Sequence, residues 1–351
     1  MIFRYIAFHY IKSILIILVG LTGLFTGLDF LMNGSSLPSF NMKILYIFSK
    51  WEESLNLLYP LALVFSLIWT NISFIKQNTI ASFYALGLSR REFAQPFLWV
   101  AVGVYILFIG LNFTSFSTAK DRAVMVKKQE YGISKTEDLF FKYDDSFVYI
   151  KTLIPEQFKI EGLTIFKLDE GKIVETYSSK EAWYNIHEWV ASDVIKKSKF
   201  SNERGEEYLK IEHIALLHTL KNYQPKILTS IYDEHQLTLY ESIKGKRLLE
   251  NQGLSTDFLV SNIYSKVFMP LFSIAVVMIL LFTLPFHARY MNLSFTTMKA
   301  LGGTLFIWGV LFALQGMGQS GALNAELAII LPILLLFLYA FYTYKKSDNL
   351  I

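Results

Sequence analysis

Side chains that commonly carry out catalysis are few in this sequence, and they are scattered. The chain contains no cysteine, which excludes thiolate chemistry and cysteine-ligated zinc. The six histidines do not cluster, and His213 and His218 lie five residues apart on a predicted strand, so their side chains point to opposite faces. Neither common glycine-rich phosphate-binding loop is present. The sequence therefore predicts no catalytic centre, no metal site and no cofactor bound by this chain.

Charged residues inside apolar stretches are functional candidates, because burying a charge in hydrocarbon is costly. Asp29 lies near the end of the first apolar stretch. It either reaches water there or lines a cavity, and both readings stay open. A carrier driven by protons or sodium would be expected to have more such carboxylates or broken helices. If the protein moves a substrate, the energy is expected to come from elsewhere.

The stretch Lys76–Pro96, KQNTIASFYALGLSRREFAQP, is too polar for lipid and too apolar for a plain loop. Ile80, Phe83 and Tyr84 recur at helical spacing, which predicts a short amphipathic helix. Such a helix either lies in the membrane interface or places an apolar side chain in a groove of another protein. In the second case, Phe83 and its neighbours are the expected contact.

Signals for a helix stop and a new helix start follow directly. Gly87 adopts the left-handed conformation cheaply and is expected to end the short helix. Ser89 and Glu92 have the S-x-x-E spacing of a capping box, which begins the next helix. Arg90 and Arg91 come next and suit lipid phosphates or an acidic partner.

The composition is that of a membrane protein, with 53% hydrophobic residues and a mean hydropathy of +0.38. The net charge of +4 gives no indication of nucleic-acid binding. The first apolar run exceeds the length of a signal-peptide core, so we expect an uncleaved helix. Six stretches have the length of a membrane-spanning helix, namely Ser13–Met32, Leu55–Ile75, Phe97–Phe116, Val267–Phe286, Lys299–Met317 and Leu327–Tyr344.

Basic residues at the ends of these spans predict their orientation, because cytoplasmic segments are enriched in lysine and arginine. On the opposite side, Lys43 and Lys50 are offset by Glu52 and Glu53. Both termini are therefore expected in the cytoplasm and the segment after the third span outside. The basic residues on the predicted cytoplasmic side are Arg4, Lys12, Lys76, Arg90, Arg91, Arg289, Lys345 and Lys346.

The long middle segment, residues 117–266, predicts an all-β domain. Its apolar and polar residues alternate, as in Ser146–Thr152, and Asp169–Gly171 is a hairpin signal. Short strands without helices between them are typical of an antiparallel sandwich or jelly roll. The expected fold is an α-helical membrane protein with six transmembrane helices, in segments 1–116 and 267–351, plus an all-β periplasmic domain that is jelly-roll-like. Helical connectors are expected at both ends of the domain.

Glycines and aromatic residues are mixed in the fifth span, over Gly302–Gly316. Glycines allow close helix approach, while Phe306, Trp308 and Phe312 are bulky and apolar. This pattern indicates either a movable wall beside an apolar ligand or ordinary static packing.

The chain as a whole resembles the lipopolysaccharide export permease family LptF/LptG (YjgP/YjgQ), and is more LptG-like. The resemblance covers essentially the entire chain. It rests on the layout of three spans, a β-domain and three spans, and on the segments Arg4–Ile6, Leu58–Leu63, Ala85–Phe93, Asp144–Lys151 and Tyr264–Leu281.

The resemblance implies a non-enzymatic permease subunit of an ABC transporter in the bacterial inner membrane, with lipopolysaccharide as its substrate. A paralogous LptF-like permease is the implied partner, and a cytoplasmic LptB-like ATPase dimer is expected to bind ATP and magnesium. Periplasmic jelly-roll bridge proteins, LptC/LptA-like, are the implied receivers of the lipid. Nucleic acid is not an expected partner.

The resemblance also implies two sets of site residues. The ATPase-coupling helix, within residues 76–90, is matched by Thr79, Ile80, Phe83, Tyr84, Ala85, Leu86, Gly87, Leu88, Ser89 and Arg90. The lipid cavity or lateral gate, between spans one and five, is matched by Phe25, Thr26, Asp29, Phe30, Phe306, Trp308 and Phe312.

Two positions depart from the family pattern. Thr79 stands where a glutamate is common, so coupling is expected to depend on shape and apolar contact more than on charge. Thr26 stands where LptG-type members carry a basic residue for lipid phosphates. Other bases are candidates for that contact, namely Lys43, Lys50, Lys120, Arg122, Lys127 and Lys128.

Two other classes of function are open to this sequence. One is a membrane-anchored ligand-binding or sensor protein with an extracytoplasmic β-domain, although the cytoplasmic segments are short and hold no output domain. The other is a membrane-embedded enzyme acting on lipids, although no nucleophile–base or metal constellation supports it. Co-purification of a small ATPase and a second permease distinguishes the transporter from both.

Overall fold

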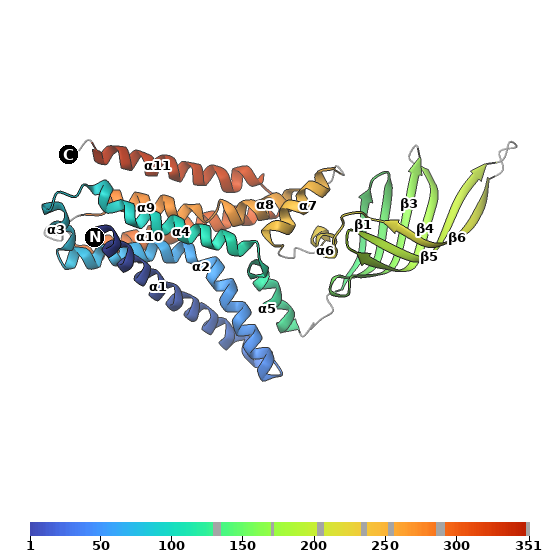
Figure 1. Ribbon diagram of the computed structural model, residues 1–351, viewed down its shortest axis with the longest axis horizontal. Coiled ribbons are helices and arrows are strands. Elements are labelled where there is room, and N and C mark those ends of the chain that lie inside the picture. The colour runs from blue at the N-terminus through green and yellow to red at the C-terminus, as the bar shows by residue number, and fades with distance from the viewer. Residues whose placement is uncertain are drawn as a thin grey trace. The chain divides into compact units, whose positions relative to one another are not determined.

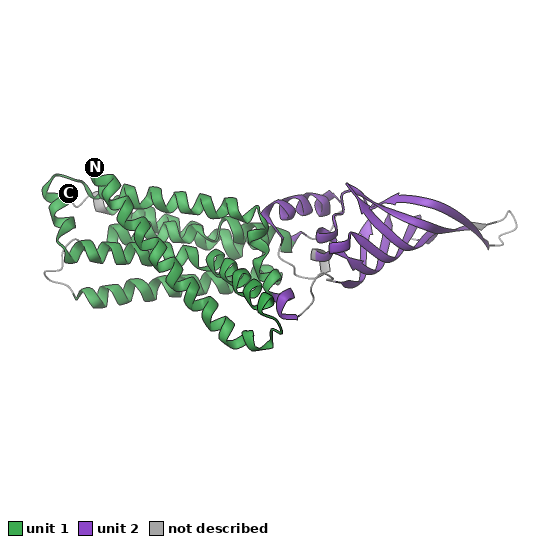
Figure 2. Cartoon of the chain, turned by 60° about the horizontal axis from the view of Figure 1, so that its bottom comes forward, with its two compact units in different colours: residues 1–123, 257–351 green, residues 124–256 purple. Residues whose placement is uncertain are grey.

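The computed structural model describes residues 1–128, 135–169, 172–201, 207–232, 237–251, 256–285 and 292–348. The chain forms two compact units, coloured separately in Figure 2. The helical unit comprises Met1–Ala123 and Asp257–Ile351, and the β unit comprises Val124–Thr256. The β unit is narrower than the predicted domain 117–266, because helix α8 (Asp257–Val267) packs with helix α10 of the helical unit.

Within the described residues, six helical segments are long and apolar enough to cross a membrane, which confirms a multi-pass helical membrane protein. Figure 1 shows the start of α1, the short helix α3 (Thr79–Ala85) and the end of α11 at the same end of the helical unit. The segments are α1 (Ile2–Asn33), α2 (Phe40–Lys76), α4 (Arg90–Asn112), α8 with α9 (Leu271–Thr283), α10 (Leu293–Gln319), and a π-helical turn (Glu326–Ile330) leading into α11 (Leu331–Asp348).

Helix α2 begins at Phe40, well before the predicted start of the second span at Leu55. Residues expected in a connecting segment are therefore helical, namely Lys43, Lys50, Glu52 and Glu53. The predicted span covers the apolar part of this helix, and the helix continues before it. Three of these charges have partners, since Lys50 lies 3.5 Å from Asp29 of α1 and 2.9 Å from Glu53, and Glu52 pairs with Arg122.

Helix α2 is the centre of the helical unit. In its most apolar stretch 78% of the residues are buried, against 22% for the corresponding stretch of α1 and 17% for that of α10. Several buried polar groups in this core are paired within the chain, as suits a setting without water. The Tyr10 hydroxyl donates a hydrogen bond to the carbonyl of Leu63 at 2.9 Å. Asn56 of α2 and Asn112 of α4 exchange two hydrogen bonds at 3.1 and 3.2 Å.

The β unit contains a six-stranded antiparallel sheet whose strand order, β1 to β6, follows the sequence. An all-β domain is thus confirmed. Tight hairpins explain the order, because two-residue loops force consecutive strands to pair; Tyr143 pairs with Ser146, and Asp169 pairs with Lys172. The described strands form a meander without the crossover of a Greek-key jelly roll. They are β1 (Thr136–Tyr143), β2 (Ser146–Ile154), β3 (Lys159–Asp169), β4 (Lys172–Asn185), β5 (Glu188–Ser201) and β6 (Glu207–Thr219).

One face of the sheet carries the core of the β unit, as the alternating sequence predicted. Trp189 is fully buried, and its indole nitrogen donates a hydrogen bond to the carbonyl of Tyr223 at 2.7 Å. Leu228, from α6 (Pro225–Tyr232), completes this apolar cluster. The connectors α5 (Ala119–Lys128) and α7 (Leu239–Asn251) are helical, as expected. The hairpin signal Asp169–Gly171 falls partly outside the described residues.

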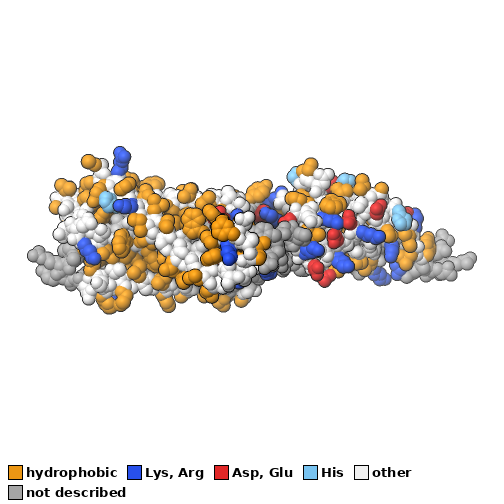
Figure 3. All heavy atoms as spheres, turned by 90° about the horizontal axis from the view of Figure 1, so that it is seen from below, with side chains coloured by type: hydrophobic (Ala, Val, Ile, Leu, Met, Phe, Trp, Pro, Cys, Tyr) orange, Lys and Arg blue, Asp and Glu red, His pale blue; other side chains and the backbone are white. Residues whose placement is uncertain are grey.

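The two units differ in surface chemistry. On the face drawn in Figure 3, hydrophobic side chains are spread over the helical unit, and charged side chains of both signs gather over the β unit. An apolar exterior suits helices that contact lipid, whereas a charged exterior suits a domain in water.

Gly162 gives a direct test of the β unit. It lies in β3 at a φ of +74°, and a Cβ atom there would come within 2.8 Å of the Lys151 Cβ. Gly162→Ala should therefore destabilise the unit by about 1–2 kcal/mol from backbone strain alone. The readout is the melting temperature of the purified protein in detergent. Gly103→Ala in α4, where nothing lies within 4 Å of the added atom, is the matched control and should cause no loss.

Candidate functional site

Helix α3 (Thr79–Ala85) and the turn after it adopt the predicted stop. Gly87 has a φ of +85°, a conformation that glycine adopts without steric cost. The amide of Gly87 donates to the carbonyl of Tyr84 at 2.9 Å, and the amide of Leu88 donates to the carbonyl of Phe83 at 3.1 Å. These two bonds form a Schellman motif, so the helix end is closed by its own backbone.

The predicted restart is confirmed as well. The amide of Ser89 donates to the Glu92 carboxylate at 2.8 Å, and the amide of Glu92 donates to the Ser89 hydroxyl at 3.3 Å. This reciprocal capping box begins α4 at Arg90. The turn between α3 and α4 is therefore held by hydrogen bonds on both sides, and is built as a defined corner.

The apolar face of α3, for which the sequence left open a contact with another protein, points inward. Ile80 and Phe83 are 1% and 9% exposed and belong to the core of the helical unit. The Phe83 ring lies 6.2 Å from Tyr5, 6.4 Å from Phe74 and 6.4 Å from Phe93, measured between ring centroids. The Phe83 ring packs among α1, α2 and α4 of its own chain, which leaves little of it exposed for a direct contact with a partner.

The outward face of α3 carries a single large apolar side chain. Leu86 is 72% exposed, and the residues around it, Ala81, Ser82 and Ala85, are small and exposed. Thr79, Tyr84 and Leu88 are half-buried, and burial raises the pKa of the Tyr84 hydroxyl to about 12. The exposed surface of α3 and its end therefore consists of one leucine surrounded by small residues.

Both arginines after the turn lie against other helices. The Arg90 guanidinium donates from Nε to the carbonyl of Leu281 and from Nη2 to the carbonyl of Leu284, both at 3.0 Å. The Arg91 guanidinium carbon lies 4.5 Å from the centre of the Tyr344 ring. These contacts bring the first residues of α4 to the ends of α9 and α11. Arg289, which also entered the charge pattern, lies outside the described residues.

The residues proposed for a lipid cavity fall into two groups. Phe25 on α1 and Phe306 and Phe312 on α10 are exposed, with Phe306 at 73%, whereas Trp308 is half-buried. Thr26 is buried, and its hydroxyl hydrogen-bonds the Ser54 hydroxyl of α2 at 3.2 Å. The aromatic residues thus lie on the surface of the helical unit, and Thr26 packs inside it.

Asp29 and Phe30 also take part in packing within α1 and α2. Asp29 accepts hydrogen bonds from the Tyr46 hydroxyl and from Asn33, and it lies near Lys50. Lys50 pairs in addition with Glu53 at 2.9 Å. The Phe30 ring lies against Gly34, at the end of the same helix.

Sequence reasoning missed the polar seam that these contacts form between α1 and α2. Its signal was available, because the α1 members recur at nearly helical spacing along one face. On α2, Tyr46, Lys50 and Ser54 are spaced by four residues, and Trp51 lies beside Lys50 in the sequence. The seam consists of Thr22, Thr26, Asp29 and Asn33 on α1, and of Tyr46, Lys50, Trp51 and Ser54 on α2.

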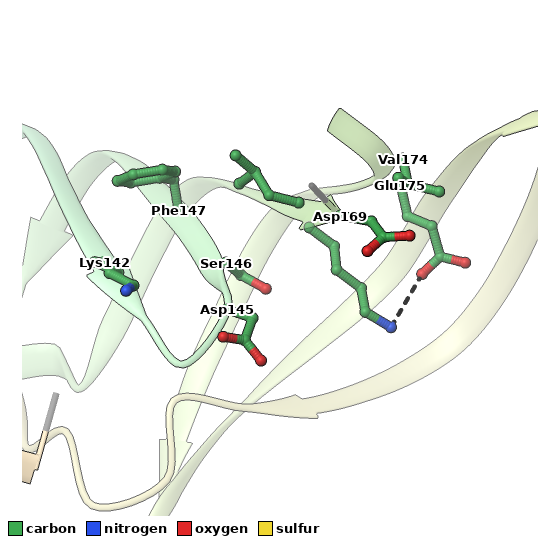
Figure 4. Close-up of a pocket in the computed structure, with 9 residues that line it drawn as sticks. Lys142, Asp145, Ser146, Phe147, Asp169, Val174 and Glu175 are labelled. Carbon is green, nitrogen blue, oxygen red and sulfur yellow. Dashed lines mark ion pairs between the residues drawn. The ribbon is translucent and has the colours of Figure 1, made fainter. Parts of the chain in front are cut away.

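The β unit has a hollow of about 760 Å³ between the β1–β2 and β3–β4 hairpins. Figure 4 shows Lys142, Asp145, Asp169 and Glu175 among the side chains around it. Lys196 bonds to Glu175 at 2.7 Å, and this hydrogen bond holds the pKa of the Glu175 carboxyl below its usual value. Lys167 pairs with Glu175 as well, so both acids and bases line this hollow. No cluster of three or more metal-binding side chains occurs within the described part of the chain.

Comparison with known proteins identifies a family. A family model described as lipopolysaccharide export system permease LptF/LptG matches residues 4–346, nearly the whole chain. That description covers the two permeases together. No curated protein matches this sequence.

The orientation of α3 predicts unequal effects of two substitutions. Phe83→Ala removes a ring from a packed core and should destabilise the protein by about 3–5 kcal/mol. Leu86→Ala changes a surface residue and should stay within about 0.5 kcal/mol of the parent. Melting temperatures in detergent measure both. Equal losses for the two variants would contradict the orientation of α3.

Proposed function

The chain belongs to the family of lipopolysaccharide export permeases LptF/LptG, and on that premise we propose that it is the permease subunit of an ATP-driven transporter. The transporter extracts lipopolysaccharide from the bacterial inner membrane and passes it to a periplasmic bridge of LptC/LptA-like jelly-roll proteins, toward the outer membrane. The family match over residues 4–346 is the observation that carries this proposal.

Extraction of a lipid with several acyl chains needs an external source of energy. Each methylene group that leaves the bilayer for water costs about 0.8 kcal/mol. The sequence contains neither common phosphate-binding loop. We therefore assign ATP and magnesium to an LptB-like dimer of ATPase subunits, and we assign no cofactor and no catalytic residue to this chain.

Helix α3 is the proposed docking point for an ATPase subunit. Its outward face offers Leu86, flanked by Ala81, Ser82 and Ala85, to a shallow apolar groove. Thr79 carries no charge, so this contact depends on shape and apolar burial. Phe83 supports this contact indirectly, because its ring fixes α3 to the core of the helical unit.

The exposed apolar faces of α1 and α10 are the proposed contacts of a paralogous, LptF-like permease. Large apolar side chains stand out from both helices, including Phe25 and Phe306. Two such permeases facing one another would enclose a cavity, with α1 of one beside the fifth span of the other as its gates. Lys50 and Arg122 already pair with carboxylates of α1 or α2. We therefore assign the contact with lipid phosphates to the other candidate bases, namely Lys43, Lys120, Lys127 and Lys128.

The proposed topology puts both termini and α3 in the cytoplasm and the β unit in the periplasm. An even number of spans returns the chain to the side where it began. Lys12, Lys76 and Lys345 lie toward the α3 end of their helices, and positive charge favours the cytoplasmic side.

The docking role of α3 is tested with Leu86→Asp. A carboxylate at the centre of an apolar contact has to be desolvated without a partner, so retention of the ATPase should fall at least tenfold. The measurement is the amount of ATPase subunit that co-purifies with the permease. Leu216→Asp is the matched control, because Leu216 is also exposed but lies on β6 of the β unit.

Two results are informative against the proposal. Full retention of the ATPase by Leu86→Asp would remove α3 from the docking surface. Purification of the parent protein without any ATPase or second permease would favour the membrane-anchored binding protein instead.

A further inference from the structure

The end of α9 is held by a side chain from a distant part of the sequence. The last carbonyls of a helix lack partners within that helix and form the negative end of its dipole. Arg90 approaches two such carbonyls, of Leu281 and Leu284, at 3.0 Å each. These residues lie 191 and 194 positions further along the chain. Arg90 is therefore a side-chain cap for α9.

Aromatic contacts extend this cap to α11. The Arg90 guanidinium carbon lies 5.7 Å from the centre of the Phe282 ring, and that ring makes an edge contact with Tyr344 at 5.1 Å. Arg91 lies over the Tyr344 ring at 4.5 Å. Cations over aromatic faces are attracted to the ring electrons. We call the four side chains Arg90, Arg91, Phe282 and Tyr344 the arginine clamp.

The clamp begins where α3 ends. Only the turn from Leu86 to Ser89 separates α3 from Arg90, and the Schellman motif and the capping box close that turn on both sides. When α3 is displaced, the first residues of α4 are therefore expected to move with it. Arg90 is half-buried, and it engages helix carbonyls rather than presenting its charge to solvent.

We propose that the arginine clamp makes the ends of α9 and α11 move together with α3, so that the second half of the helical unit follows any push on the first half. Arg90 is a positioning residue, which acts through α9 and touches no lipid. Its two-point contact needs the planar fork of arginine, because lysine presents a single ammonium group. The inference rests on the proposed function, since the push is that of the docked ATPase.

The first experiment compares Arg90→Lys and Arg90→Gln in the purified complex of permeases and ATPase, reconstituted in lipid vesicles. The measured quantity is the lipopolysaccharide released per ATP hydrolysed. We expect ATP hydrolysis to stay within about twofold of the parent, and the ratio to fall about tenfold in both variants. Arg4→Lys is the matched control, because Arg4 is exposed and carries the same substitution. An unchanged ratio in both Arg90 variants overturns the proposal.

The second experiment reads the clamp directly, without transport. The chain has no cysteine, so two introduced cysteines are its only thiols. Spin labels at Gln77, just before α3, and at Thr283, the last residue of α9, are both on exposed positions. We expect one narrow distance distribution in the parent and a broad one after Arg90→Lys. Equal widths of the two distance distributions, in the parent and in Arg90→Lys, overturn the proposal. This result does not depend on transport. It is therefore distinct from a failure of the proposed function, in which the parent complex exports no lipopolysaccharide.

A third pair of variants covers the case in which Arg90 variants do not assemble. Tyr344→Phe keeps the ring under Arg91, whereas Tyr344→Leu removes it. We expect the lipopolysaccharide released per ATP hydrolysed to equal that of the parent for Tyr344→Phe and to fall about threefold for Tyr344→Leu. Identical ratios for the two variants overturn the part of the proposal that concerns α11.

Discussion

Every helix end leaves backbone amides and carbonyls without partners in that helix, and turns, side chains or water have to satisfy them. Around α3, three of these ends are satisfied by the chain itself. The end of α3 closes on its own backbone, the start of α4 uses the Ser89–Glu92 box, and the end of α9 uses the guanidinium of Arg90. The corner at Gly87 is therefore defined by hydrogen bonds on both sides, although α3 itself has only seven residues.

The same principle governs what the helical unit keeps inside and what it leaves outside. Several polar groups of α1 pair along the seam with α2, where Asp29 meets Tyr46 and Lys50. Large apolar side chains stand on the outside of α1 and α10, including Phe25 and Phe306. A surface of this kind suits lipid or a second membrane protein.

Local signals in the sequence predicted local structure well. The stop at Gly87, the capping box and the six spans all depend on residues within a few positions of one another. The face of α3 that points inward could not be predicted in this way, because Phe83 is enclosed by Tyr5 and Phe74, which are distant in the sequence. A helical period shows that an apolar face exists, but it does not show whether the chain's own core or another protein covers it. The contact of Arg90 with α9 has no sequence signature, since its acceptors are backbone carbonyls.

The central claim is that this chain exports lipopolysaccharide from the inner membrane. It is tested most directly by depleting the protein in its native cells, separating the two membranes, and measuring lipopolysaccharide in each. The account predicts that newly made lipopolysaccharide accumulates in the inner membrane as the protein is lost. An unchanged amount of new lipopolysaccharide in the outer membrane, after complete depletion, would contradict it.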